Sequence, residues 1–140
     1  MQLNLIVTVL ILYKVSLMKN FKKKTVVLGA SLNPERYSYL AVHRLRSRQH
    51  PVVAIGKREG KVADVTITKE HPELSDVDTV TLYLNANNQK QYYDYIFSLH
   101  PKRIIFNPGA ENDELAKIAA AKGIQPLEAC TLVMLSTGMY

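Results

Sequence analysis

The chain has 140 residues, which is enough for one domain with a single core but too few for a nucleotide-binding domain plus a separate catalytic domain. Its formal net charge of +6 favours anionic ligands, but apart from Lys22–Lys24 the cations are scattered, and no face interleaves aromatic side chains with cations, so we expect no nucleic-acid partner. A single cysteine, Cys130, excludes an intrachain disulfide and indicates a reducing, cytoplasmic compartment.

The first residues differ in character from the rest of the chain. The apolar run Leu3–Leu12 is too short to span a membrane as a helix, has no basic residue before it and lacks a small-residue cleavage site, so we expect neither secretion nor a membrane partner. Because Met18 directly precedes the basic run, we interpret residues 1–18 as an N-terminal extension, with the biological start at Met18, and residues 19–140 as the domain. If the extension is present, its β-branched residues favour an added edge strand or an oligomer contact.

The next stretch predicts a buried strand over Thr25–Leu28, a tight glycine turn and a loop that enters a helix. Gly29 permits the sharp turn, and the small Ala30 and Ser31 let a pyrophosphate approach exposed N–H groups at a positive helix terminus. The dinucleotide fingerprint has further glycines where this chain has Ser31 and Pro34, so the turn alone is a weak signal.

A helix over Tyr39–Arg48 leads to a second strand, Pro51–Ile55, which ends in Gly56, Lys57 and Arg58. An NAD site would place an acidic side chain near this strand end. Cations suit a phosphorylated ribose instead, because charge-assisted contacts to phosphate are roughly twice as strong as neutral hydrogen bonds. The nearest cofactors are coenzyme A (CoA), with its 3′-phosphate, and NADP, with its 2′-phosphate. The alternative is a solvated basic turn.

Strands and helices then alternate with short links. The patterns predict strands over Val62–Thr68, Thr79–Leu84, Arg103–Phe106 and Ile124–Glu128, and helices over Gln89–Leu99, Asp113–Lys122 and Cys130–Met139. This alternation predicts an α/β domain with a single Rossmann-like, doubly wound and mainly parallel sheet flanked by helices.

Two further loops are expected at the ligand-binding edge of such a sheet, because ligands bind beyond the carboxyl ends of parallel strands. Asn85 in the first loop can contact a cofactor or cap a helix. The tyrosines of the helix Gln89–Leu99 are more typical of a core or an interface than of an adenine platform. For Cys130 we expect a small buried hydrophobic residue, with a thiol facing a cofactor as the alternative. The residues of these two loops that we expect at the ligand are Leu84 and Asn85 in the first loop and Asn107, Pro108 and Gly109 in the second.

In combination these motifs resemble the small stand-alone CoA-binding proteins, which are similar to the Rossmann-type CoA-binding domain of the succinyl-CoA synthetase α subunit. The resemblance covers nearly everything from Lys24 to the last residue. It rests on Gly29-Ala30-Ser31 with Pro34, Arg36, Tyr37 and Ser38, on the strand that ends before Lys57, on Asn107-Pro108-Gly109, and on Gly123-Ile124 before Glu128 and Cys130. One departure is that related domains often have an aromatic residue and a glutamine around the turn that is Phe106–Gly109 here.

The resemblance implies CoA or an acyl-CoA as the cofactor. It implies that the loop Gly29–Ser31, with Arg36, holds the CoA phosphates, that Lys57 meets the 3′-phosphate, and that the loops after Leu84 and Phe106 line the cofactor. The expected binding residues are therefore Gly29, Ala30, Ser31, Pro34, Arg36, Tyr37, Ser38, Gly56, Lys57, Arg58, Leu84, Asn85, Asn107, Pro108 and Gly109.

Catalysis is not implied. The synthetase carries its phosphorylated histidine on a second domain for which this chain has no room, and none of the four histidines lies in a glycine-rich loop of that kind. We therefore expect non-catalytic binding, with no catalytic or metal-ligating residue. The alternatives are an NADP-dependent reductase, which lacks an evident Tyr-Lys or Ser-His pair and a substrate domain, and a nucleotide-binding regulatory or scaffold subunit. A homo-oligomer or a separate protein partner stays open.

Overall fold

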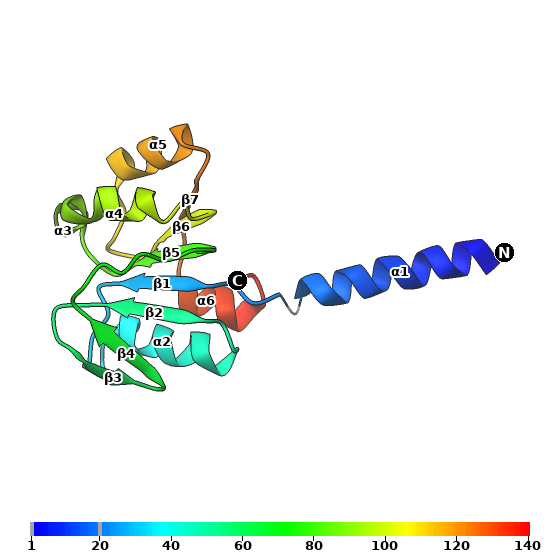
Figure 1. Ribbon diagram of the computed structural model, residues 1–140, viewed down its shortest axis with the longest axis horizontal. Coiled ribbons are helices and arrows are strands. Elements are labelled where there is room, and N and C mark those ends of the chain that lie inside the picture. Colours follow the sequence, from blue (N-terminus) through cyan, green and yellow to red (C-terminus); the bar gives the residue numbers. More distant parts are fainter. Residues whose placement is uncertain (1, 20) are drawn as a thin grey trace.

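The computed structural model describes residues 2–19 and 21–140 of the chain, with side chains for residues 4–14 and 21–140. A seven-stranded sheet with the strand order β3-β4-β2-β1-β5-β6-β7 forms its centre (Figure 1). All neighbouring strands are parallel except the antiparallel pair β3 and β4. The strands are β1 (Thr25–Leu28), β2 (Val52–Ile55), β3 (Gly60–Val62), β4 (Val65–Thr68), β5 (Thr79–Leu82), β6 (Arg103–Phe106) and β7 (Gln125–Glu128).

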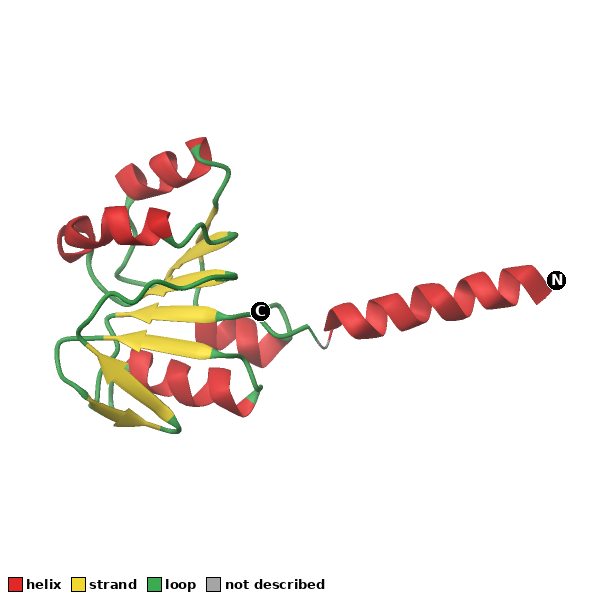
Figure 2. Ribbon diagram, in the orientation of Figure 1, coloured by secondary structure: helices red, strands yellow, loops and turns green. Residues whose placement is uncertain are grey.

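Helices cover both faces of this sheet, which confirms the doubly wound α/β fold (Figure 2). On one face lie α2 (Tyr37–Ser47) and α6 (Thr131–Thr137), which pack on each other and on the sheet. On the other face lie the short α3 (Ala86–Gln89), the 3₁₀ helix η1 (Lys90–Tyr92), α4 (Tyr93–Ser98) and α5 (Asp113–Ala121). The predicted helix over Gln89–Leu99 is therefore divided between the end of α3, η1 and α4.

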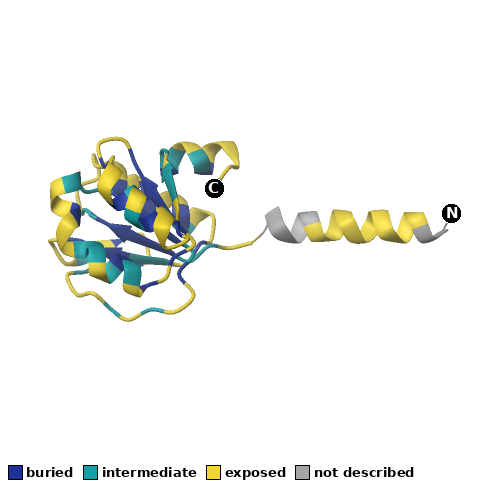
Figure 3. Cartoon of the chain, turned by 90° about the horizontal axis from the view of Figure 1, so that it is seen from above, coloured by how far each residue is buried: buried dark blue, intermediate teal, exposed yellow. Residues whose placement is uncertain are grey.

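The two faces bury separate hydrophobic clusters because successive side chains of a strand point to opposite sides. Val26 and Leu28 of β1 belong to the cluster under α4 and α5, whereas Val27 between them belongs to the cluster under α2. Every residue of β1, β5 and β6 is buried, as expected for parallel strands covered on both sides (Figure 3). This is why the sequences of the central strands are continuous runs of mostly apolar residues and do not alternate between apolar and polar residues.

The prediction of one strand over Val62–Thr68 is wrong. The chain turns at Ala63 and Asp64, so that β3 and β4 form a hairpin in which Val62 pairs with Val65. Ala63 has a φ of +54°, a conformation that alanine rarely adopts, and the residues contain no Asn-Gly or Asp-Gly signal that would have predicted the turn. Asp64 is held by Arg46 of α2, whose Nε and Nη2 donate to the two carboxylate oxygens at 2.8 Å each.

The N-terminal segment forms a helix, α1 (Gln2–Lys19), and the expectation of an added edge strand is wrong for it. A helix satisfies its own backbone groups within the segment, whereas an added strand needs a free sheet edge in register. The helix extends away from the sheet (Figure 1), and apolar side chains from Leu5 to Leu12 remain about half exposed or more. Among the described residues, no helix is both long and apolar enough to cross a membrane.

Candidate functional site

The parallel register aligns the carboxyl ends of four strands at one edge of the sheet. Leu28 pairs with Ile55 and with Leu82, and Leu82 in turn pairs with Phe106. The turns that follow these residues therefore open side by side. The first strand lies between β2 and β5, so the chain changes direction across the sheet at β1, which is the position where open α/β sheets bind ligands.

A cavity of about 540 Å³ lies at this edge and brings most of the predicted residues together. It takes residues from the turns after β1, β2, β5 and β6 and from the first turn of α2. The predicted residues that line it are Gly29, Ala30, Ser31, Arg36, Tyr37, Ser38, Gly56, Lys57, Arg58, Leu84, Asn85, Pro108 and Gly109.

The glycine turn after β1 has the conformation that the sequence predicts, but its amides are not all free. Gly29 has a φ of +90°, and a Cβ atom there would lie 2.7 Å from the carbonyl oxygen of Tyr83. The N–H groups of Gly29 and Ala30 both donate to the carbonyl oxygen of Ile55, at 3.0 and 2.9 Å. The expectation that this part of the turn offers free N–H groups to a phosphate is thus wrong, because these two donors tie β1 to β2.

Free donors lie immediately downstream. The amides of Ser31 and Leu32 form no hydrogen bond within the described part of the chain, and neither do the first amides of α2, those of Tyr37 and Ser38. Arg36 occupies the N-cap of α2 without a side-chain cap. Because unsatisfied N–H groups and the helix dipole make an N-terminus attractive to anions, this turn of α2 can contribute to an anion site.

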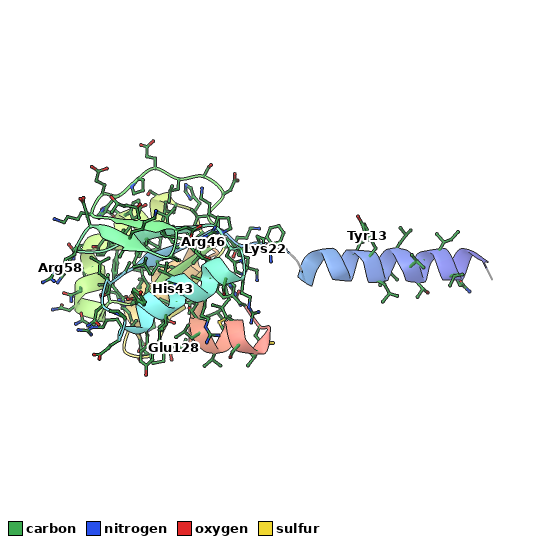
Figure 4. The ribbon with its side chains drawn as sticks, turned by 90° about the horizontal axis from the view of Figure 1, so that it is seen from below. Tyr13, Lys22, His43, Arg46, Arg58 and Glu128 are labelled. Carbon is green, nitrogen blue, oxygen red and sulfur yellow. The ribbon has the colours of Figure 1, made fainter. Side chains whose placement is uncertain are left out.

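The turn after β2 lies directly against the turn after β1. Gly56 is buried, and a Cβ atom there would lie 2.2 Å from the carbonyl oxygen of Ala30. Lys57 and Arg58, which follow, are exposed, and Arg58 projects from the body of the domain (Figure 4). No ion pair within the described residues engages either of them.

The cavity therefore has a strongly cationic end. Arg36, Lys57 and Arg58 line it there, and no aspartate or glutamate side chain is among the residues that line any part of it. The cations of the β2 end and the turn after β1 lie at the same edge of the sheet, as the prediction of a phosphate site requires.

The loop after β5 enters α3 through a capped turn. The Asn85 side chain accepts a hydrogen bond from the amide of Asn88 at 2.9 Å, so Asn85 caps the helix and also lines the cavity. Behind it, Gln89 is fully buried and donates to the carbonyl oxygens of Leu84 and Ala110, both at 2.7 Å. Gln89 also accepts from Asn112 at 2.8 Å, so one side chain joins the loops after β5 and β6.

The loop after β6 contributes less to the cavity than predicted. Asn107 does not line the cavity, because its buried side chain donates to Thr81 and to the carbonyl oxygen of Leu82 and accepts from the amide of Thr131. Pro34, in the loop before α2, is exposed and also lies outside the cavity lining.

The amide of Gly109 is already occupied. Its N–H group donates to both carboxylate oxygens of Glu111, at 2.6 and 3.0 Å. This backbone donor of the loop after β6 is therefore engaged by a side chain of the chain itself.

Several lining residues were missed from the sequence. Tyr83 follows the last residue of β5, and its hydroxyl is buried without a hydrogen-bond partner in the described structure, while burial raises the pKa of that group. Tyr92 ends η1 and lines the cavity, and it also packs against the hydrophobic cluster under α4 and α5. The missed residues are Leu32, Tyr83, Asn88, Gln91, Tyr92 and Ala110.

The remaining chemically active side chains do not form a second centre in the described residues. Cys130 lies at the N-cap of α6 and is half-buried, so it is less buried than the small buried hydrophobic residue expected there. His43 lies on the exposed side of α2 (Figure 4). Within the described part of the chain, no group of three or more His, Cys, Asp or Glu residues is arranged to hold a metal ion.

Solved structures with this fold include one relative of substantial sequence identity. An uncharacterised protein is 51% identical, with a TM-score of 0.83 over 86% of this chain and 99% of its own. A hypothetical protein from Pyrococcus horikoshii OT3 is 18% identical, with a TM-score of 0.76 over 91% of this chain and 92% of its own. A protein from Thermus thermophilus, cell-free ID.343, is 14% identical, with a TM-score of 0.76 over 91% of this chain and 98% of its own. These last two establish similarity of fold only.

No curated protein matches this chain. A family model described as "CoA binding domain" matches residues 23–136, which include all seven strands and every residue of the cavity described above. The chain therefore belongs to the CoA-binding domain family.

Proposed function

We propose that the cavity at the carboxyl edge of the sheet binds coenzyme A or an acyl-CoA, and that the chain carries out no reaction on it. The observation that carries this proposal is the concentration of cations at one end of a cavity without a carboxylate in its lining. The family to which the chain belongs supports CoA as the ligand. The expected cytoplasmic location and the resemblance to the CoA-binding domain of succinyl-CoA synthetase agree with this role.

The phosphates would lie between the turns after β1 and β2. Arg36 and the amides of Ser31 and Leu32 can meet the diphosphate, and Lys57 with Arg58 can meet the 3′-phosphate. Charge-assisted hydrogen bonds to phosphate are stronger than neutral ones, and Arg can contact it with two donors at once. The pantetheine arm would then extend over β1 and β5 toward the loops that Gln89 joins.

Thermal denaturation with CoA, 3′-dephospho-CoA and NADPH tests this assignment. A ligand at 100 times its Kd stabilises a protein by about 2.7 kcal/mol, which raises the Tm of a domain of this size by roughly 5–10 °C. We expect CoA to raise the Tm most and dephospho-CoA to raise it less. NADPH giving the largest shift would favour the reductase alternative and contradict the proposal.

The role of Lys57 is tested with the same ligands. In Lys57→Ala the difference between the CoA and dephospho-CoA shifts should narrow, because the 3′-phosphate loses its cation. Lys61→Ala is the matched control, since Lys61 is exposed on β3 and does not line the cavity. A difference that stays the same in Lys57→Ala would show that this lysine does not meet the 3′-phosphate.

A further inference from the structure

The two ends of the cavity differ in charge. The three cations of its lining, Arg36, Lys57 and Arg58, all come from the turns beside β1 and β2. At the other end the lining residues of the loops after β5 and β6 are neutral, with the side-chain amides of Asn85, Asn88 and Gln91 as the polar groups. In the strand order β2-β1-β5-β6, the outermost turns of the two ends, those after β2 and after β6, lie three strand spacings apart, about 14 Å.

A carboxylate stands at the rim of the neutral end. Glu111 is exposed, but both its oxygens bind the amide of Gly109, which lines the cavity. Its charged neighbours in sequence, Asp113 and Glu114 in the first turn of α5, are acidic as well. No salt bridge within the described residues neutralises Glu111. The amide that could have received an anion is thus held by a fixed negative charge.

We infer that Glu111 selects the acyl group of the ligand: the neutral end admits free CoA or thioesters of uncharged acyl groups and disfavours acyl groups that carry a carboxylate. This inference rests on the proposed function, because the cationic end must first fix the phosphates and so send the thiol end of the ligand toward β6. A carboxylate arriving there meets the charge of Glu111 and finds the Gly109 amide already bonded. An uncharged acyl group meets neither obstacle.

Titration calorimetry of the full chain with acetyl-CoA and succinyl-CoA tests this selection. Both ligands share the CoA moiety, so the ratio of their dissociation constants isolates the acyl group. We expect succinyl-CoA to bind about five- to tenfold more weakly than acetyl-CoA, which is the size expected for a partly screened like-charge contact. In Glu111→Gln the ratio should fall to about twofold or less. Asp113→Asn is the matched control, because it removes an exposed charge two residues away that, unlike Glu111, holds no amide of the cavity lining, and it should leave the ratio unchanged.

A second measurement needs no variant. In the unaltered protein the ratio should shrink as the salt concentration rises from about 0.02 M to about 0.5 M, because salt screens the contact between the two carboxylates. Equal or tighter binding of succinyl-CoA, or a ratio that neither salt nor Glu111→Gln changes, would overturn the inference while leaving CoA binding intact. If CoA itself does not bind, the proposed function fails and the inference fails with it.

Discussion

His50 couples the stability of the domain to pH. It is buried just after α2, and its Nδ1 accepts a hydrogen bond from the amide of Lys23 at 2.9 Å, so the ring is neutral in the folded chain. Burial, together with the nearby cations of Lys22, Lys23 and Arg103, lowers the pKa of His50 from 6.5 to about 4. The unfolded chain therefore binds the proton more readily. The stability that neutral His50 contributes is fully present above pH 6.5, and this contribution is lost as the pH falls from 6.5 to about 4.

This loss should reach up to about 3 kcal/mol in the free energy of unfolding, and urea denaturation at several pH values measures it. In His50→Gln the decline between pH 6.5 and about 4 should be much smaller than in the unaltered chain. His43→Gln serves as the control, since His43 is exposed on α2 and its replacement should leave the decline in place. The same pH profile in both variants would contradict the role given to His50.

Gln89 determines how the elements on the cofactor side are joined. Its fully buried side chain donates to the carbonyl oxygens of Leu84 and Ala110 and accepts from the side-chain amide of Asn112. Replacement by leucine nearly keeps the volume but removes all three hydrogen bonds, so the carbonyl oxygens of Leu84 and Ala110 lose this donor, while Asn112 keeps its bond to the Tyr93 hydroxyl. Since each buried polar group left unsatisfied costs about 1–3 kcal/mol, Gln89→Leu should lower the free energy of unfolding by about 2–4 kcal/mol.

Chemical denaturation of Gln89→Leu beside Gln91→Leu separates this effect from a general intolerance of leucine. Gln91 is exposed, and its one hydrogen bond to the carbonyl oxygen of Asn88 is 3.4 Å long, so its replacement should change the stability by no more than about 0.5 kcal/mol. Equal effects of the two substitutions would show that the buried link is unimportant.

The elements that the sequence predicted well are those whose signal is local. Central strands such as Arg103–Phe106 are short apolar runs bounded by turns, and the helix over Asp113–Lys122 begins after an asparagine cap, so pattern and structure agree. The hairpin within Val62–Thr68 was missed because its turn uses an alanine with positive φ instead of a turn residue. The helical state of residues 2–19 was missed because β-branched residues there were read as strand signals.

For the candidate site, the sequence predicts which turns come together but not which way each side chain in them points. Once the strands are parallel, the turns after Leu28, Ile55, Leu82 and Phe106 must share an edge, so the placement of Lys57 beside the first glycine turn follows from topology. Which way a side chain points within a turn depends on contacts distant in sequence. Asn107 turns inward to Thr81 and Thr131, and that cannot be read from the residues around it.

On the scale of the whole molecule, the chain divides into a packed domain and a helix whose described side chains, those of residues 4–14, belong to neither hydrophobic cluster. Both hydrophobic clusters are made of residues that follow Lys24, and the family match begins at residue 23. In α1, Leu5, Val9 and Leu12 are each more than half exposed. Stability should therefore come from the domain alone, while the exposed apolar helix promotes association of the chain with itself.

A chain that begins at Met18 tests this division against the full chain. Its Tm in differential scanning calorimetry should lie within about 2 °C of the full chain, because no core residue is removed. In sedimentation velocity the full chain should form larger species than the shortened one, and replacing Leu5, Val9 and Leu12 by glutamine in the full chain should reduce them without changing the Tm. This triple variant separates the apolar surface of α1 from its length. A Tm lowered by more than about 5 °C on removal of residues 1–17 would contradict this division and indicate that α1 packs on the domain in solution, because burial of its apolar side chains would then stabilise the fold.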